Sequence, residues 1–260
     1  MSEESPLSLP FLLQSLLLLQ SKSFVHAAGI SIEDRGLLLP AFGGVGKTSF
    51  IARVSRVPGV RVFGDDMVIV TQHGTMEPYL RPFALYEYHR ELFPDFYARN
   101  QLRYKPLTLS WRIFNKIRAE AGKLMGKDWQ QPWNTVRTGY VPVSPERVLG
   151  SRALAERPTK LEEVYVLQRA NTAILQISPI EANKGVEFML GVLYHEWYSQ
   201  LRLLLSWLVH REQSIRGYLG AVEGIIRSAV SSCRRVNRVL IPREMSPMEF
   251  ADELLQYVLR

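Results

Sequence analysis

The chain has 260 residues, of which 47% are hydrophobic and 22% are charged, and its net charge is +7. These values exclude a largely disordered chain and are typical of a globular protein with a sizeable core. The single cysteine, Cys233, excludes an internal disulfide framework and favours a reducing compartment such as the cytoplasm. We expect its thiol to act as a small buried apolar group.

The first patterned segment is the apolar run at residues 11–19, which Gln14 and Ser15 interrupt. Acidic residues precede it where a secretory signal carries basic ones, and no small-residue cleavage site follows. The run is also too short to cross a bilayer. We therefore expect an amphipathic or buried helix packed on the core, and no membrane span.

A phosphate-binding motif is predicted in the next segment. Residues 23–32 are expected to form a strand that contains His26, and a polar turn leads to LLLPAFGGVGKTS at 37–49, whose order is strand, glycine loop, helix. Backbone N–H groups of such a loop wrap phosphates, and the helix N-terminus adds partial positive charge. The pattern predicts that Lys47 reaches the β- and γ-phosphates and that the Thr48 hydroxyl binds Mg²⁺. The residues expected to contact the nucleotide are Gly43, Gly44, Val45, Gly46, Lys47, Thr48 and Ser49.

The phosphate-loop consensus has glycine where this chain has Ala41. A methyl group costs little there if the backbone keeps a negative φ, so we interpret the loop as a variant of the motif. The alternative is an ordinary glycine-rich turn that carries Gly-Lys-Thr by chance. The strand before the loop and the helix after it favour the motif.

Two carboxylates follow the next predicted strand. Residues 60–63 are expected to form that strand, Gly64 ends it, and Asp65 and Asp66 precede a further strand at 67–70. Carboxylates at a strand end beside a phosphate loop are where α/β folds place Mg²⁺ ligands and general bases. A plain Asp-Asp turn is the alternative, and the upstream loop favours a functional pair.

His26, the loop GGVGKT and the sequence GDD at 64–66 together resemble the catalytic domain of HPr kinase/phosphorylase and its relatives, a P-loop group related to phosphoenolpyruvate carboxykinase. His26 stands 21 residues before Lys47, and Asp66 stands 19 after it, as in that family. The resemblance covers roughly residues 20–75. It implies one α/β domain over 1–260, with a nucleotide core at about 20–98 and 160–183, a basic helical insertion at about 99–159, and a helix-rich part at about 184–260.

The resemblance also implies a function, an ATP- and Mg²⁺-dependent kinase that phosphorylates a hydroxyl group of a protein, peptide or small molecule. Lys47 would hold the transferred phosphoryl group, and Thr48 and Asp65 would bind Mg²⁺. Asp66 would accept the proton of the acceptor hydroxyl, and His26 would lie near the γ-phosphate. The Glu-x-Arg-Gly-Leu stretch of the phosphorylase members is missing from this sequence, which argues against HPr as the acceptor and against the phosphorylase reaction.

The positive charge is concentrated between Arg99 and Lys127, where eight basic residues accompany one acidic residue. The helical periodicity at 111–127 gives this segment a basic face, which either is solvated or binds an anionic acceptor. Residues 128–146 are expected to form a long loop of the lid or binding type. The sequence contains no recognised nucleic-acid reader motif, which argues against nucleic acid as the partner.

The last third of the chain is expected to alternate strands and helices. Strands are predicted near 164–167, 173–177 and 236–241, and a helix at 215–233. A final helix, with a capping box at Ser246 and Glu249, is predicted from Ser246 to Leu259. A helix over 186–209, introduced by a capping box at Ser178 and Glu181, is apolar on nearly every face and would be fully buried or form an oligomer interface. His195 and Glu196 are neighbours on it without a third ligand, which argues against a metal site.

A second function stays open beside the kinase. The chain would then be a nucleotide-binding switch that transfers no phosphoryl group and changes its shape or assembly between nucleotide states. The guanine-reading Asn-Lys-x-Asp motif is absent, because the sequence at 115–118 ends in Arg118. An ordinary GTPase is therefore not expected.

Overall fold

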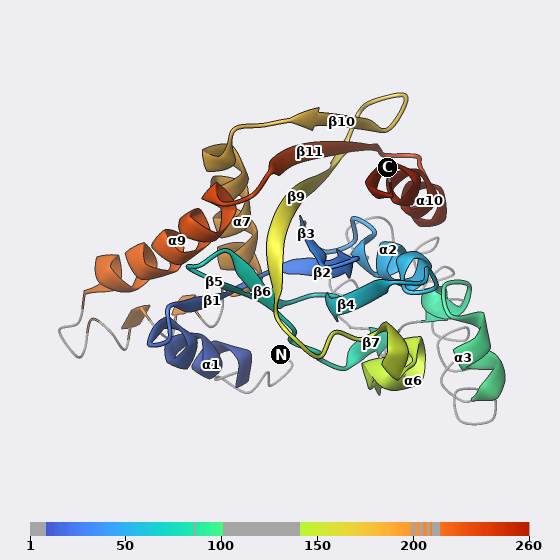
Figure 1. Cartoon of the computed structure of the whole chain (residues 1–260), viewed down its shortest axis with the longest axis horizontal. Helices are drawn as coiled ribbons and strands as arrows, with labels where there is room; N and C mark the ends of the chain where they lie inside the picture. Colours follow the sequence, from blue (N-terminus) through green and yellow to red (C-terminus); the bar gives the residue numbers. More distant parts are fainter. Residues whose placement is uncertain are drawn as a thin grey trace, which may run out of the picture. The chain divides into compact units, whose positions relative to one another are not determined.

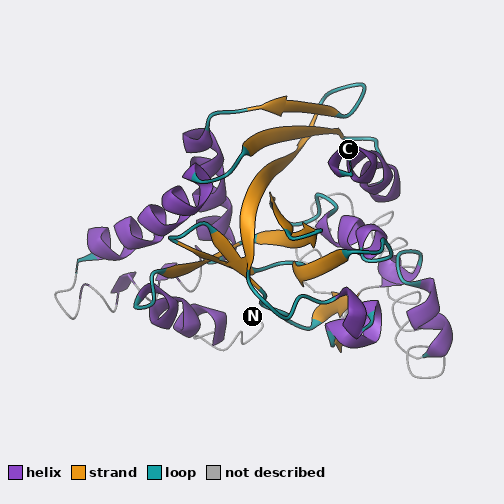
Figure 2. Cartoon of the chain, viewed as in Figure 1, coloured by secondary structure: helices purple, strands orange, loops and turns teal. Residues whose placement is uncertain are grey.

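The computed structural model describes residues 9–85, 87–100, 141–198, 201–202, 205–206, 209 and 214–259. Over these residues the protein is a mixed α/β structure (Figure 2). The chain divides into two compact units, one formed by Met1–Arg81 with Arg152–Arg260 and the other by Pro82–Ser151. The helix predicted at 111–127, nearly all of the basic segment, and the loop predicted at 128–146 except its last residues lie outside the described residues.

A nine-stranded mixed sheet forms the centre of the first unit. The long strand β9 has β3 and β11 as parallel neighbours and β6 as an antiparallel one, and it runs through the sheet in Figure 1. The order is β1-β5-β6-β9-β3-β2-β4, and β11 lies between β9 and β10. The strands are β1 (Lys22–Val25), β2 (Ala27–Ile32), β3 (Arg35–Pro40), β4 (Val60–Gly64), β5 (Val68–Thr71), β6 (Thr75–Glu77), β9 (Thr159–Ala170), β10 (Gln176–Pro179) and β11 (Arg235–Pro242).

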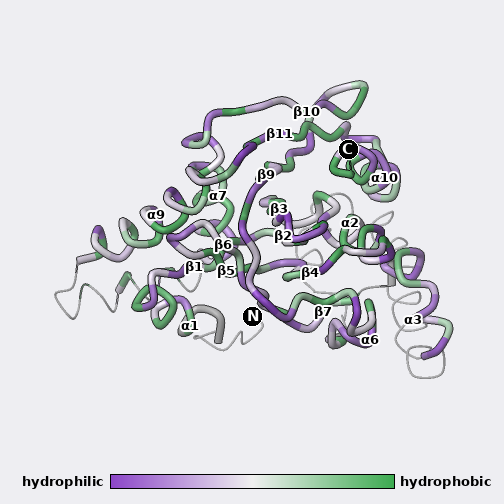
Figure 3. The backbone as a smooth tube through the Cα atoms, in the orientation of Figure 1, coloured by the Kyte–Doolittle hydropathy of each residue, from purple (hydrophilic) through white to green (hydrophobic). Residues whose placement is uncertain are grey.

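Helices of the first unit bury their apolar faces on this sheet or on one another. Helices α7 and α9 pack side by side against the strands, α1 packs on β1, and α10 packs on α2 (Figure 1). Along α9 and α10, hydrophobic residues alternate with hydrophilic ones as an amphipathic helix requires (Figure 3). The bounds are α1 (Leu9–Leu18), α2 (Lys47–Val54), α7 (Ala182–Glu196), α9 (Ile215–Ser231) and α10 (Pro247–Val258).

The second unit contains a two-stranded antiparallel sheet and short helices. Its described elements are β7 (Phe83–Leu85), the 3-10 helix η1 (Glu87–Arg90), α3 (Pro94–Arg99), β8 (Val141–Val143) and α6 (Pro145–Leu149). A further 3-10 helix, η3 (Ser151–Ala153), begins at the last residue of this unit. None of the described helices combines the length and the apolar character that crossing a bilayer requires.

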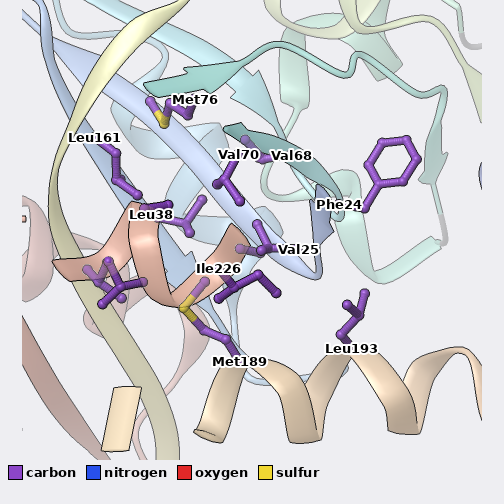
Figure 4. Packing of buried hydrophobic residues seen from close by; sticks show 14 of the residues in the cluster. Phe24, Val25, Leu38, Val68, Val70, Met76, Leu161, Met189, Leu193 and Ile226 are labelled. Atoms are coloured by element: carbon purple, nitrogen blue, oxygen red, sulfur yellow. The ribbon is translucent and has the colours of Figure 1, made fainter. Parts of the chain in front are cut away.

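The main core lies between the sheet and helices α7 and α9. Met189 and Leu193 point from α7 toward the strands, and Ile226 of α9 meets them there (Figure 4). Strands β2 and β3 are buried along nearly their whole length, because other elements cover both faces of the sheet at its centre. The packing on both faces of the sheet fixes the position of the C-terminal end of β3, and the predicted phosphate loop begins there.

The strand predicted at 23–32 is in fact two strands separated at His26. β1 pairs with β5, whereas β2 pairs with β3 and β4, so the chain changes partners at His26 and the hydrogen-bond ladder stops there. The polar turn predicted after this segment, at residues 33–36, is confirmed at its first two residues, whereas Arg35 and Gly36 already belong to β3. Glu33 and Asp34 form it with φ values of 51° and 68°, as a tight hairpin turn requires.

The capping box predicted at Ser178 and Glu181 is wrong. Ser178 and Pro179 belong to strand β10, where they pair with Arg238 and Asn237, and α7 begins only at Ala182. Pairing with β11 therefore carries the strand through the residues that the sequence pattern assigns to a helix start. The capping box of Ser246 and Glu249 at the start of α10 is confirmed.

The predicted burial of the 186–209 helix on nearly every face is also wrong over its described part. Val186, Met189 and Leu193 are buried, but Glu187 and Glu196 are not. The apolar residues thus form one buried stripe along α7. The polar residues in the last turn of α7 lie outside this stripe and can contact neighbouring loops.

Candidate functional site

The predicted order of strand, loop and helix is confirmed around residues 41–46, which we call the glycine loop. It leads from β3 into α2, whose first residue is Lys47. Gly44 and Gly46 have φ values of 77° and 121°, a region that residues with a Cβ rarely adopt. Ala41 is not among the residues with positive φ, so a methyl group at the consensus glycine position causes no backbone strain.

Gly46 is required for a second reason, the close approach of α10. A Cβ on Gly46 would lie 2.9 Å from a ring carbon of Phe250, whereas a Cβ on Gly44 would meet no described atom within 4 Å. Arg169, at the end of β9, donates hydrogen bonds to the carbonyls of Pro242 and Met245 and, at 3.4 Å, to that of Val45. These contacts hold the glycine loop between β9 and α10.

Lys47 is buried under the glycine loop. Its Nζ donates to the carbonyl oxygens of Ala41 at 2.8 Å and Phe42 at 3.2 Å. The same atom lies 3.2 Å from Nε2 of His26. Burial lowers the pKa of Lys47, and the carboxylate of Asp66 opposes this shift. The ammonium group therefore has its position fixed by backbone acceptors at the base of the loop.

His26 joins Lys47 to the acidic residues, because the break between β1 and β2 turns its side chain into the site. Its Nε2 lies 3.3 Å from Oδ1 of Asp66. A single ring nitrogen cannot accept a proton from Lys47 and donate one to Asp66 at once, so the tautomer decides which contact is a hydrogen bond. Burial lowers the pKa of His26, and Asp66 opposes this, so the imidazole favours its neutral form.

Thr48 and Asp65 form the second pair of the site. Thr48 Oγ1 donates a hydrogen bond of 2.9 Å to Oδ2 of Asp65. The other oxygen, Oδ1, is enclosed and has no hydrogen-bond partner among the described residues. Burial, with the nearby charge of Asp66, raises the pKa of Asp65 to about 7. An enclosed carboxylate oxygen without a donor is a group that a cation would satisfy.

These two side chains fit a magnesium ion that also binds phosphates. Mg²⁺ takes oxygen ligands and usually keeps only one or two from protein, with waters and phosphate oxygens as the rest. Within the described parts of the chain, no group of three or more His, Cys, Asp and Glu side chains is arranged to hold a metal alone. A hydroxyl and a carboxylate beside a glycine loop therefore suit a metal that arrives with a nucleotide.

Asp66 is the accessible carboxylate of the site. Its side chain is 55% exposed, and Oδ2 lies 3.9 Å from a guanidinium nitrogen of Arg81. Asp65 points inward to Thr48. Of the two neighbouring aspartates, Asp65 is therefore enclosed and Asp66 is exposed. Asp66 is thus the one open to a group that approaches from solvent.

Glu196 also belongs to this site, although no pattern in the sequence indicates it. Glu196 is the last residue of α7, and its Oε1 accepts a hydrogen bond of 3.3 Å from the Gly43 N–H and lies 3.9 Å from His26 Nε2. Beside it, the rings of His195 and Phe188 contact Phe42 edge to face. No local pattern links residues this far apart in the sequence, so the contact appears only once α7 packs on the sheet.

The structure brings most of the predicted site residues together. His26, Lys47, Thr48, Asp65 and Asp66 lie in one connected set of contacts at the glycine loop. The side chains of Val45 and Ser49 are buried, so these residues offer a nucleotide their backbone and no accessible side chain. No protein-family model matches the chain, and no curated protein matches it.

Proposed function

We propose that this protein is an ATP- and Mg²⁺-dependent phosphotransferase with a nucleotide-binding core of the HPr kinase type. The observation that carries the proposal is the set of contacts in which His26 links Lys47 to Asp66 beside the Thr48–Asp65 pair. A cation, a metal-binding pair and an accessible carboxylate are what phosphoryl transfer needs for charge neutralisation and for activation of the acceptor.

In this proposal the glycine loop and the N-terminus of α2 hold the phosphates of ATP, and Thr48 and Asp65 hold the metal. The metal, when bound, neutralises charge on the phosphate oxygens. Lys47 exchanges its contacts with Ala41 and Phe42 for phosphate oxygens. Neutral His26 lies between the ammonium group of Lys47 and the carboxylate of Asp66 and hydrogen-bonds to one of them at a time.

Asp66 acts as the base in the proposed transfer. The acceptor hydroxyl gives its proton to Asp66 as its oxygen bonds to the γ-phosphorus, and the bond from that phosphorus to the bridging oxygen of ADP breaks. The products are a phosphate ester and ADP. The exposure of Asp66 supports this role, because the base has to meet an acceptor that arrives from solvent.

The test is incubation of the protein with Mg²⁺ and ATP labelled in its γ-phosphate, in the presence of a lysate and a small-metabolite pool. The comparison is with Asp66→Asn, and with Asp34→Asn as a control in an exposed turn whose positive φ asparagine tolerates. We expect the wild type and the control to label an acceptor and Asp66→Asn to lose at least about a hundredfold in rate.

Two outcomes would overturn the proposal, one for the assigned base and the other for the kinase activity. Full transfer by Asp66→Asn would exclude Asp66 as the base. Tight ATP binding by the wild type with no labelled acceptor would instead favour the nucleotide-binding switch.

A further inference from the structure

The last turn of α7 places a carboxylate in the glycine loop. Oε1 of Glu196 accepts a hydrogen bond from the Gly43 N–H, and it is also the closest described atom to the position that a Cβ on Gly43 would take, at 3.9 Å. Under the proposed function, this N–H is one of the donors that hold phosphate oxygens. The carboxylate of Glu196 thus occupies a position that a phosphate oxygen of the nucleotide would take.

The position of this carboxylate points to the terminal phosphate. Its Oε1 lies 3.9 Å from His26 Nε2, which in turn lies 3.2 Å from the ammonium nitrogen of Lys47. A lysine of a phosphate loop reaches the β- and γ-phosphates. Glu196 therefore lies on the side of the loop that faces Lys47 and, under the proposed function, the outer phosphates of the nucleotide.

The placement of Glu196 is not explained by helix stability. A carboxylate in the last turn of a helix faces the negative end of the helix dipole, which is unfavourable. The helix end is nevertheless held at the loop, because Leu193 is buried in the core and Phe42 contacts Phe188 and His195. The contact with Gly43 is thus built into the packing of α7.

From these contacts we infer that Glu196 competes with the terminal phosphate of the nucleotide, so that α7 sets the balance between triphosphate and diphosphate binding. The inference rests on the proposed function, and it adds an element of regulation to the same site. Glu196 has to leave Gly43 before a triphosphate binds fully. A diphosphate, which lacks the terminal phosphate, is affected less.

The test measures dissociation constants for ATP and for ADP, each with Mg²⁺, by equilibrium titration. It uses the full chain, Glu196→Gln, and Glu187→Gln as a matched control on the exposed side of α7. The glutamine keeps the size of the side chain and removes its charge. We expect Glu196→Gln to bind ATP about three- to fivefold more tightly, with a smaller change for ADP, and Glu187→Gln to match the wild type.

The outcomes separate this inference from the function on which it rests. If the wild type binds ATP and Glu196→Gln binds it no more tightly, or gains equally for ATP and ADP, the competition with the terminal phosphate is wrong and the nucleotide site stands. If the wild type binds neither nucleotide, the proposed function fails as well.

Discussion

Each glycine of the loop meets a different physical requirement, although the sequence motif treats them alike. Gly46 has a positive φ and lies against Phe250, Gly44 has a positive φ in open space, and Gly43 has neither constraint. The requirement for glycine therefore differs from one position to the next. Backbone strain and close packing act together only at Gly46.

This difference predicts a graded effect of alanine on stability. We expect Gly46→Ala to lower the free energy of unfolding by about 2–3 kcal/mol, because it combines strain with a clash, and Gly44→Ala by about 1 kcal/mol, from strain alone. Gly43→Ala should stay within about 0.5 kcal/mol of the wild type. Urea unfolding at one pH measures all three. Equal effects at Gly43 and Gly46 would contradict the conformations described for the loop.

Strand β9 carries a buried ionic network that connects its neighbours. The fully buried carboxylate of Glu163 lies 3.0 Å from Arg35 of β3 and 3.9 Å from Arg235 of β11, and it accepts a hydrogen bond from Tyr165. Arg35 also donates to the carbonyl of Val258 at the end of α10. Glu163 thus links β9 to two neighbouring strands, and Arg35 extends the network to the end of α10.

Removing this charge should destabilise the protein strongly. Glu163→Gln leaves the Arg35 guanidinium without its counter-charge in a partly buried position, and we expect the free energy of unfolding to fall by about 2–3 kcal/mol. Glu162→Gln, on the same strand but partly exposed and 3.8 Å from Lys160, should cost less than about 1 kcal/mol. Denaturant unfolding measures both. The network would be unimportant if the two variants had equal stability.

At this scale the sequence predicted those elements whose signals are local. The capping box of Ser246 and Glu249 is a complete local signal, and α10 begins where it indicates. The break at His26 and the extension of β10 through Pro179 were missed, because strand pairing with distant segments decides both. Periodicity within a short window carries no information on such partners.

At the scale of the whole molecule, we expect the buried His89 of the second unit to make stability depend on pH. Burial lowers the pKa of this histidine from 6.5 to about 4. The unfolded chain therefore binds more protons than the folded one between these values, and stability is lost as the pH falls from 6.5 toward 4.

Replacing His89 should flatten this part of the pH profile. Between pH 6.5 and pH 4 we expect the stability of the wild type to fall by about 2 kcal/mol more than that of His89→Gln. Denaturant unfolding at several pH values checks the difference in slope. The same substitution at an exposed histidine, His73→Gln, serves as the control. Parallel profiles for the wild type and His89→Gln would show that His89 is not the group responsible.

A larger part of the candidate site than of the surrounding fold could be predicted from the sequence. The glycine loop, Lys47, Thr48 and the Asp65–Asp66 pair follow from motif chemistry and spacing, and the structure joins them to His26. Glu196 reaches the site only through tertiary packing, so no spacing in the sequence indicates it. The difference is physical: a loop carries its own backbone geometry, whereas α7 supplies its carboxylate only after it has packed on the sheet.

In our proposal the glycine loop binds a nucleotide through Lys47, and the most direct test is calorimetric titration of Mg²⁺–ATP into the intact protein and into Lys47→Ala. Lys184→Ala, at an exposed position on α7, is the matched control. We predict saturable binding by the wild type and the control, and a loss of at least about tenfold in affinity for Lys47→Ala, because a charge-assisted contact to phosphate is removed. Equal ATP affinity of Lys47→Ala and the wild type, or no binding by the wild type, would contradict the account.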